Sequence, residues 1–173
     1  MRAWLAAAEA SLLRSLVGQV MTLVAAENTE EDTTDVDDLE ALFIASPDNA
    51  PETPDDPVLA RLLPDGYTDD PEAAGEFRKY TEAGLRSAKH RAAMDMLATL
   101  PVAGGRVQLS GEQAVAWLKA LNDIRLALGV RLGVTEEFEE QWGRLAQDDP
   151  QWTAFEVYAW LGAVQESLVQ ALG

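Results

Sequence analysis

The amino-acid sequence predicts an all-α protein, built as an orthogonal helical bundle of four to six helices with at most a marginal short strand. Apolar residues recur at helical spacing in four long segments, and helix-capping signals stand at the borders of most of them. The chain has 173 residues, of which 47% are hydrophobic and 25% charged, so it can bury one core. We therefore expect residues 1–173 to form a single domain.

The first helix is expected near residues 3–24, where Leu12 and Leu16 belong to a stripe of apolar residues at helical spacing. Glu9 and Arg14 interrupt the apolar stretch. No uninterrupted run therefore approaches the length of a signal peptide or of a membrane span. The sequence predicts a cytoplasmic protein that makes no contact with membranes.

An acidic, proline-rich segment follows at about residues 27–56, and we expect it to be a mobile linker. Lysine and arginine are absent between Arg14 and Arg61, while acids crowd this stretch and four prolines interrupt it. Residues 38–44 have enough apolar positions for two helical turns inside the linker. The acids do not follow the spacing of a calcium-binding loop, so no metal site is predicted there.

The later helices are bounded by proline, serine and glycine signals. Asp56-Pro57 opens a short helix, and Asp70-Pro71 opens a long one. Gly104-Gly105 ends that region, and the alternation in residues 106–109 predicts a short strand or extended segment. Ser110 and Gln113 form a capping box before the next helix. The main helices are expected near residues 3–24, 71–99, 111–131 and 151–172, with a shorter one near 135–147.

The last predicted helix carries apolar residues over more than half of its circumference. A face this wide indicates a central core helix or a helix shared with a second chain, and a homodimer is therefore one hypothesis. The tryptophans at positions 4, 117, 142, 152 and 160 lie mostly on or beside apolar stripes. We interpret them as core residues rather than as a ligand box.

Charge and composition limit the classes of partner that the chain is expected to bind. A formal net charge of -17 and a pI near 4.2 disfavour binding to nucleic acid and to anionic lipid, and favour a basic protein partner. The alternative is that the acidity only maintains solubility. The absence of cysteine excludes disulfides, thiolate catalysis and thiol redox sensing.

No catalytic, cofactor-binding or metal-binding set emerges from the sequence. His90 is the single histidine, so it has no second histidine to join it as a metal ligand, and we expect it on the surface. Arg78, Lys79, Arg86 and Lys89 share about a third of the same helix's circumference with it. This basic face is expected either to be solvated or to hold the acidic linker against the body.

Glu9 and Arg125 both fall on apolar arcs of their helices. Charges in such positions must be paired if they are buried, so the sequence predicts a structural ion pair between the two. The alternative is that Arg125 belongs to a polar cleft with a functional role.

Four segments carry a family likeness: residues 56–65, 76–78, 117–129 and 157–161. Together they resemble an actinobacterial family known as domain of unknown function 2017, and the likeness extends over most of the chain except the acidic linker. The resemblance implies a helical, cytoplasmic, non-enzymatic protein. It also implies kinship with oxidative-stress regulators that act through a sigma factor. Thiol-based redox sensing requires cysteine, so this chain cannot share such a mechanism. Binding of a protein partner remains compatible with its sequence.

The sequence thus favours a non-enzymatic regulatory or adaptor protein that binds a basic protein partner, linked to transcription or stress and of the sigma-factor type. A small helical enzyme or ligand-binding protein, with a carboxylate and Arg125 in a cleft, is the second hypothesis. A structural homodimer is the third. The candidate structural or partner-site residues are Glu9, Arg125, Asn122, Asp123 and Trp160.

Overall fold

The computed structural model describes residues 2–25, 54–67 and 69–173. Within them the chain forms six helices and one two-stranded ribbon, so the predicted all-α class is confirmed. The predicted acidic linker falls mostly on residues 26–53, and its two helical turns fall there entirely; these residues lie outside the described part. The elements are β1 Arg2–Leu5, α1 Ala7–Ala25, α2 Pro57–Leu62, α3 Pro71–Thr99, β2 Gly105–Gln108, α4 Gly111–Leu132, α5 Phe138–Gly143 and α6 Trp152–Leu172.

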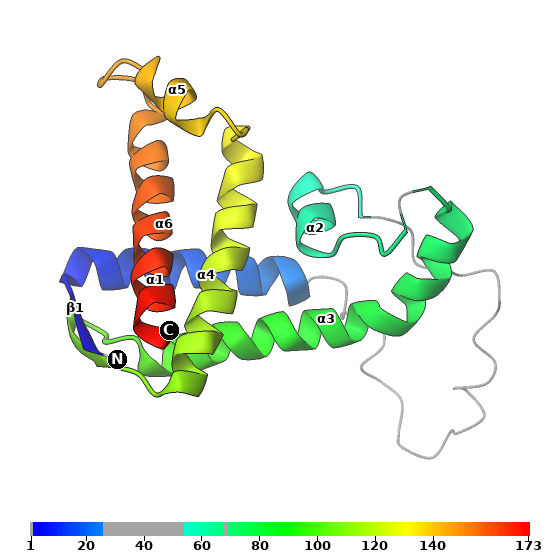
Figure 1. Ribbon diagram of the computed structural model, residues 1–173, viewed down its shortest axis with the longest axis horizontal. Helices are drawn as coiled ribbons and strands as arrows, with labels where there is room; N and C mark the ends of the chain where they lie inside the picture. Colours follow the sequence, from blue (N-terminus) through cyan, green and yellow to red (C-terminus); the bar gives the residue numbers. More distant parts are fainter. Residues whose placement is uncertain (1, 26–53, 68) are drawn as a thin grey trace.

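The helices cross in two directions. In Figure 1, α1 and α3 run roughly along the long axis of the molecule, and α4 and α6 stand across them. Helices α4 and α6 pack side by side as a hairpin, and α5 joins their far ends. The short helix α2 packs against α4. This arrangement is the orthogonal bundle that the sequence predicts.

Local capping explains why the later helix borders were predictable. The Asp70 side chain accepts a hydrogen bond from the backbone N–H of Ala73, so it caps α3 beside Pro71. Ser110 and Gln113 form the expected capping box at the start of α4. Helices α3 and α4 accordingly begin where the sequence places them.

The first predicted helix is wrong over its first residues, because residues 2–5 form a strand. Strand β1 pairs antiparallel with β2, in a register that sets Trp4 opposite Arg106. The turn before β2 needs glycine, since Gly104 has a φ of 78° and a Cβ there would lie 2.5 Å from the backbone nitrogen of Ala7. The ribbon therefore rests on the start of α1.

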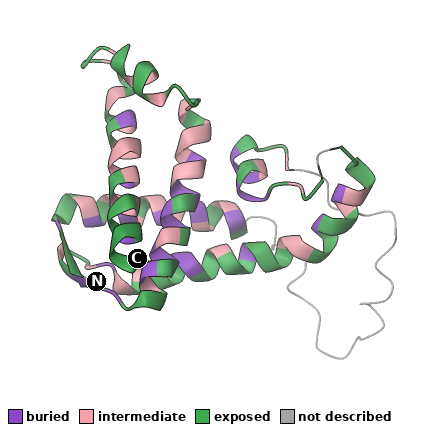
Figure 2. Cartoon of the chain, in the orientation of Figure 1, coloured by how far each residue is buried: buried purple, intermediate pink, exposed green. Residues whose placement is uncertain are grey.

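Buried apolar side chains from the ribbon and from all the helices except α5 form the core (Figure 2). Leu13 of α1, Met96 of α3 and Leu121 of α4 are fully buried, as is Leu161 of α6. Burial of a leucine side chain contributes roughly 1.5–3 kcal/mol, so this crossing of helices is the main source of stability. None of the helices in the described ranges is long and apolar enough to span a bilayer.

Away from the helix crossing, apolar residues are less buried than the sequence suggests. Trp117 is buried, but Trp160 is only half-buried and Trp4 is 75% exposed, so core packing is wrong for Trp4. On α6, the fully and nearly buried positions are few, and much of its wide apolar face keeps contact with solvent. The predicted helix near 135–147 is shortened to α5, and α6 begins at Trp152.

Candidate partner-binding groove

A shallow groove of about 260 Å³ lies between the first turns of α1 and the first half of α6. On α6 its residues recur three and four positions apart, which places them on one face of the helix. Two residues predicted as candidates, Glu9 and Trp160, line it together. The lining residues are Ala8, Glu9, Leu12, Thr153, Glu156, Val157 and Trp160.

The groove combines an apolar floor with acidic groups. Leu12, Val157 and Trp160 are half-buried, whereas Glu156 is exposed. A volume of about 260 Å³ falls short of the roughly 300–1,000 Å³ that is usual for small-molecule pockets. A protein surface that presents apolar side chains beside basic ones would complement this apolar and acidic lining better than a small ligand would.

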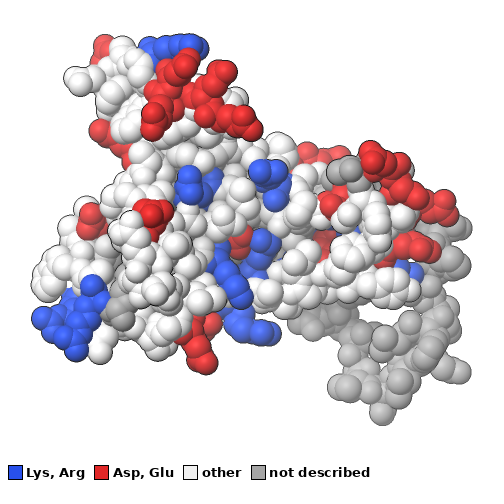
Figure 3. All heavy atoms as spheres, in the orientation of Figure 1, with Lys and Arg blue, Asp and Glu red and all other residues white. Residues whose placement is uncertain are grey.

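Acidic side chains also cluster on parts of the surface outside the groove. Figure 3 shows them gathered around α5, at the free end of the α4–α6 hairpin, and around the start of α3. Basic side chains appear on the same face over the middle of the molecule and over the ribbon. An approaching basic protein therefore meets an uneven field that is most negative at these two ends.

Glu9 has a structural contact in addition to its place in the groove. One oxygen of its carboxylate accepts a hydrogen bond from the backbone N–H of Ala6, at 2.7 Å. This bond satisfies a donor at the start of α1, where an acid is also favoured by the helix dipole. Glu9 therefore has a local structural role at the start of α1 as well as a place in the groove lining.

Arg125 does not pair with Glu9, so the predicted ion pair is wrong. The Arg125 guanidinium donates to the side-chain oxygen of Gln165 at 2.7 Å and lies 4.8 Å from the ring centre of Tyr158. The amide oxygen of Gln165 and the aromatic face of Tyr158 thus occupy the positions beside Arg125 where the sequence predicts a carboxylate. The helical wheel correctly places Arg125 on the face of α4 that packs against another helix. That helix is α6 rather than α1.

Asn122 and Asp123 lie apart from the groove. Asn122 is exposed, while Asp123 is buried and accepts a hydrogen bond from the Nζ of Lys89, at 2.6 Å. Burial raises the pKa of Asp123, although the ammonium of Lys89 opposes this shift. The pair joins α3 to α4, and this position indicates a structural role.

The predicted basic face on α3 is a buried ionic network at Arg78 and Arg86, so a solvated face is wrong for these two residues. Glu82 lies between them and contacts Arg78 at 3.0 Å and Arg86 at 2.7 Å. Arg78 also pairs with Asp65, and Arg86 donates to the carbonyl of Val24 at 2.9 Å. The network therefore ties α3 to the end of α1 and to the segment after α2.

The network shifts the ionisation of its members. Burial alone would raise the pKa of Glu82, but hydrogen bonds from Arg78 and Arg86 hold it below its ordinary value. Burial would likewise lower the pKa of Arg78, but Asp65 and Glu82 raise it. The sequence offered one signal for this network, which is the spacing of four residues between each arginine and Glu82.

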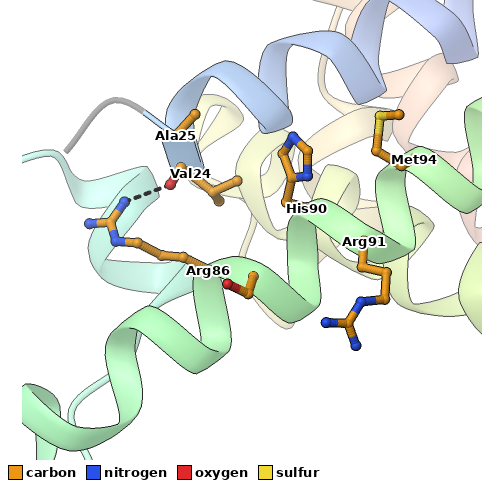
Figure 4. Close-up of a pocket in the computed structure, with 7 residues that line it drawn as sticks. Val24, Ala25, Arg86, His90, Arg91 and Met94 are labelled. Atoms are coloured by element: carbon orange, nitrogen blue, oxygen red, sulfur yellow. Dashed lines mark hydrogen bonds between the residues drawn. The ribbon is translucent and has the colours of Figure 1, made fainter. Parts of the chain in front are cut away.

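A wider pocket of about 470 Å³ lies between the end of α1 and the middle of α3. Figure 4 shows Arg86 turned toward the carbonyl of Val24, and Arg91 pointing away from the end of α1. His90 is exposed there, as the sequence predicts. Because the Arg86 guanidinium is already engaged by protein oxygens, this pocket offers less charge to a ligand than its residue types suggest.

These features define an acidic helical protein with a shallow, largely apolar groove between α1 and α6. The chain belongs to the family described as a domain of unknown function (DUF2017), which matches residues 1–172. The predicted family is thereby confirmed.

Its relatives include named regulators. The chain is 40% identical over 177 residues to the putative oxidative stress regulator AosR of Mycobacterium leprae, covering 95% of this chain and 78% of that protein. It is 38% identical over 185 residues to the oxidative stress regulator AosR of Mycobacterium bovis and of Mycobacterium tuberculosis, covering 99% of this chain and 81% of each relative. No solved structure shows a significant match to the chain.

Proposed function

We propose that this chain is a non-enzymatic, stress-linked regulatory protein of the cytoplasm that acts by binding a basic protein partner. The names of its relatives support a regulatory role in the response to oxidative stress. A sigma factor is the partner class that the family resemblance suggests, and we carry it forward as the specific candidate. Because the chain contains no cysteine, a thiol switch cannot be part of its mechanism, and we propose that it regulates by binding.

The observation that carries the proposal is the α1–α6 groove. It sets the half-buried Trp160 beside the acids Glu9 and Glu156 on a chain of net charge -17. A tryptophan in a groove is a typical anchor for a protein contact, since it contributes a large apolar area with little loss of side-chain entropy. The acids around it attract a basic surface and orient its approach.

The two alternatives have less support. An enzyme that uses a carboxylate with Arg125 needs an acid beside that arginine, and among the described residues its contacts are Gln165 and Tyr158. A homodimer through the groove would bring two acidic chains together, at a cost in repulsion. Sedimentation at two protein concentrations separates a homodimer from a complex with a different protein.

Affinity capture with charge-reversed variants tests the proposal. Extracts of the native organism are passed over the wild-type chain, Glu156→Lys and the control Glu166→Lys, which changes an exposed acid on the same helix outside the groove. We expect a basic protein to be retained by the wild type and by Glu166→Lys, and to be lost with Glu156→Lys. Retention of the same proteins by all three chains contradicts the proposal.

A further inference from the structure

The outward face of the β1–β2 ribbon carries two arginines and a tryptophan. Residues directly opposite one another in an antiparallel ribbon share a face, so Arg2 with Gln108 and Trp4 with Arg106 point to the same side. All four are exposed, and Trp4 has 75% of its surface in solvent. This set is called the Arg-Trp face below.

The opposite side of the ribbon is fixed to the core. Leu5 of β1 and Val107 of β2 are buried there and belong to the core cluster. The tight turn at Gly104 packs directly on the start of α1. The Arg-Trp face is therefore presented by a rigid platform, which lowers the entropy lost when a ligand binds.

The arginines of this face differ from three arginines that are engaged inside the protein. Arg78 and Arg86 lie in the buried network, and Arg125 is held by Gln165 and Tyr158. Arg2 and Arg106 make no ion pair within the described ranges of the chain. In Figure 3 the positive patch at the end of the molecule where the ribbon lies stands apart from the large acidic clusters.

The ribbon also has a free edge. Among the residues that the structure describes, β1 pairs with β2 alone, so its other edge lacks a strand neighbour. An edge of this kind accepts an extended peptide as a third strand, through main-chain hydrogen bonds. Every second side chain of such a peptide would point to the same side as Arg2 and Trp4.

We propose that the Arg-Trp face is a docking site for an extended, acidic protein segment that adds to β1 and places carboxylates at alternate positions beside the arginines. The charges are complementary, and the intervening apolar side chains of the segment would lie toward Ala3 and the buried side of the ribbon. The site is distinct from the α1–α6 groove in its charge, its residues and the partner chemistry it selects. It therefore does not depend on the function proposed for the groove.

Single-stranded nucleic acid also favours arginine beside an aromatic ring. The chain's net charge of -17 opposes a polyanion of that length, because every added phosphate meets the field of the whole protein. A short peptide with a few carboxylates experiences much less of that repulsion. The observations thus favour the acidic peptide.

A titration followed by the indole N–H signals in ¹⁵N-correlated NMR spectra tests the proposal. The chain has five tryptophans, and Trp4→Phe assigns the signal of interest. The probe is a six-residue peptide of alternating glutamate and valine, with a peptide of three glutamates followed by three valines as its composition control. We expect the alternating peptide to shift the Trp4 signal selectively, while the buried Trp117 signal stays in place.

Two variants set the specificity. Arg106→Glu should weaken binding of the alternating peptide by on the order of tenfold. Arg61→Glu, which reverses an exposed arginine in α2, should leave binding unchanged. Thermal unfolding of each variant confirms that the fold persists. Oligothymidylate is titrated in parallel as the single-stranded nucleic acid probe. The proposal is overturned if the alternating peptide leaves the Trp4 signal unchanged or if both peptides shift it equally. It is also overturned if oligothymidylate shifts the signal and the alternating peptide does not.

Discussion

Glu9 and Trp160 lie near opposite ends of the chain and line one groove between α1 and α6. Glu9 lines the groove from the start of α1, where its carboxylate also accepts a hydrogen bond from the N–H of Ala6. Trp160 enters it from α6 while still packing against the core. The start of α1 and the middle of α6 thus jointly form the surface on which the proposed partner binding depends.

Glu82 should be the acid on which stability depends most, because it is largely buried and contacts both Arg78 and Arg86. Glu82→Gln is expected to lower the free energy of unfolding by about 3 kcal/mol at neutral pH, as when one partner of a buried ion pair is removed. The matched control is Glu140→Gln, whose pair with Arg144 is 66% and 73% exposed and should contribute almost nothing.

The pH dependence of the same variant follows from the lowered pKa of Glu82. A carboxyl whose pKa is lower in the folded state than in the unfolded state stabilises the fold at any pH above its unfolded-state pKa, near 4.5. That stabilisation is lost as the pH falls through the folded-state pKa. The difference between wild type and Glu82→Gln should therefore be largest near pH 7 and shrink in acid. Urea unfolding from pH 7 to pH 3 measures it, and a difference that widens in acid would refute the ionic role.

Arg125 should be coupled to α6 and not to Glu9. Double-mutant cycles of Arg125→Ala with Tyr158→Leu are expected to give a coupling energy of roughly 0.5–2 kcal/mol, since the guanidinium lies over that ring. Arg125→Ala with Glu9→Ala should be additive within about 0.5 kcal/mol. Thermal or urea unfolding of the single and double variants provides the numbers. Strong coupling to Glu9 would restore the ion pair that the structure rejects.

Gly104 should be intolerant of a side chain. Gly104→Ala is expected to cost at least about 1–2 kcal/mol, because of its positive φ and because the new Cβ meets the backbone of Ala7 at 2.5 Å. Gly18→Ala is the control, since a Cβ in that part of α1 meets nothing within 4 Å. It should stabilise the protein by up to about 1 kcal/mol. Equal effects of the two substitutions in unfolding experiments would show that the ribbon turn is not tightly packed.

The parts of the fold that could be predicted are those fixed by local chemistry. The borders at Pro71 and Ser110 depend on caps within a few residues, and the apolar stripes of α3 and α4 lie within single segments. Strand β1 could not be predicted in the same way, because its partner β2 is far along the chain and residues 2–5 continue smoothly into an apolar stripe. The exposure of Trp4 follows from that same pairing.

The site was predicted in part for a similar reason. A helical wheel indicates Glu9 and a family-like segment indicates Trp160, each separately, and only the tertiary packing of α1 and α6 brings the two into one groove. The wheel also identified Arg125 as unusual, but it could not show that Gln165 and Tyr158 lie opposite it. A periodic pattern gives the face of a helix, and tertiary packing decides which residues meet that face.

The most direct test of the central claim is the affinity of the purified, captured partner for the wild-type chain and for Trp160→Ala, measured by calorimetry at low and at high ionic strength. Glu166→Lys serves as the control, and thermal unfolding confirms that each variant is folded. We expect Trp160→Ala to weaken binding by more than about tenfold, because it removes the anchor of the groove. Wild-type binding should also weaken steeply as salt screens Glu9 and Glu156. Unchanged affinity of Trp160→Ala at both ionic strengths would contradict the assignment of the groove as the partner site.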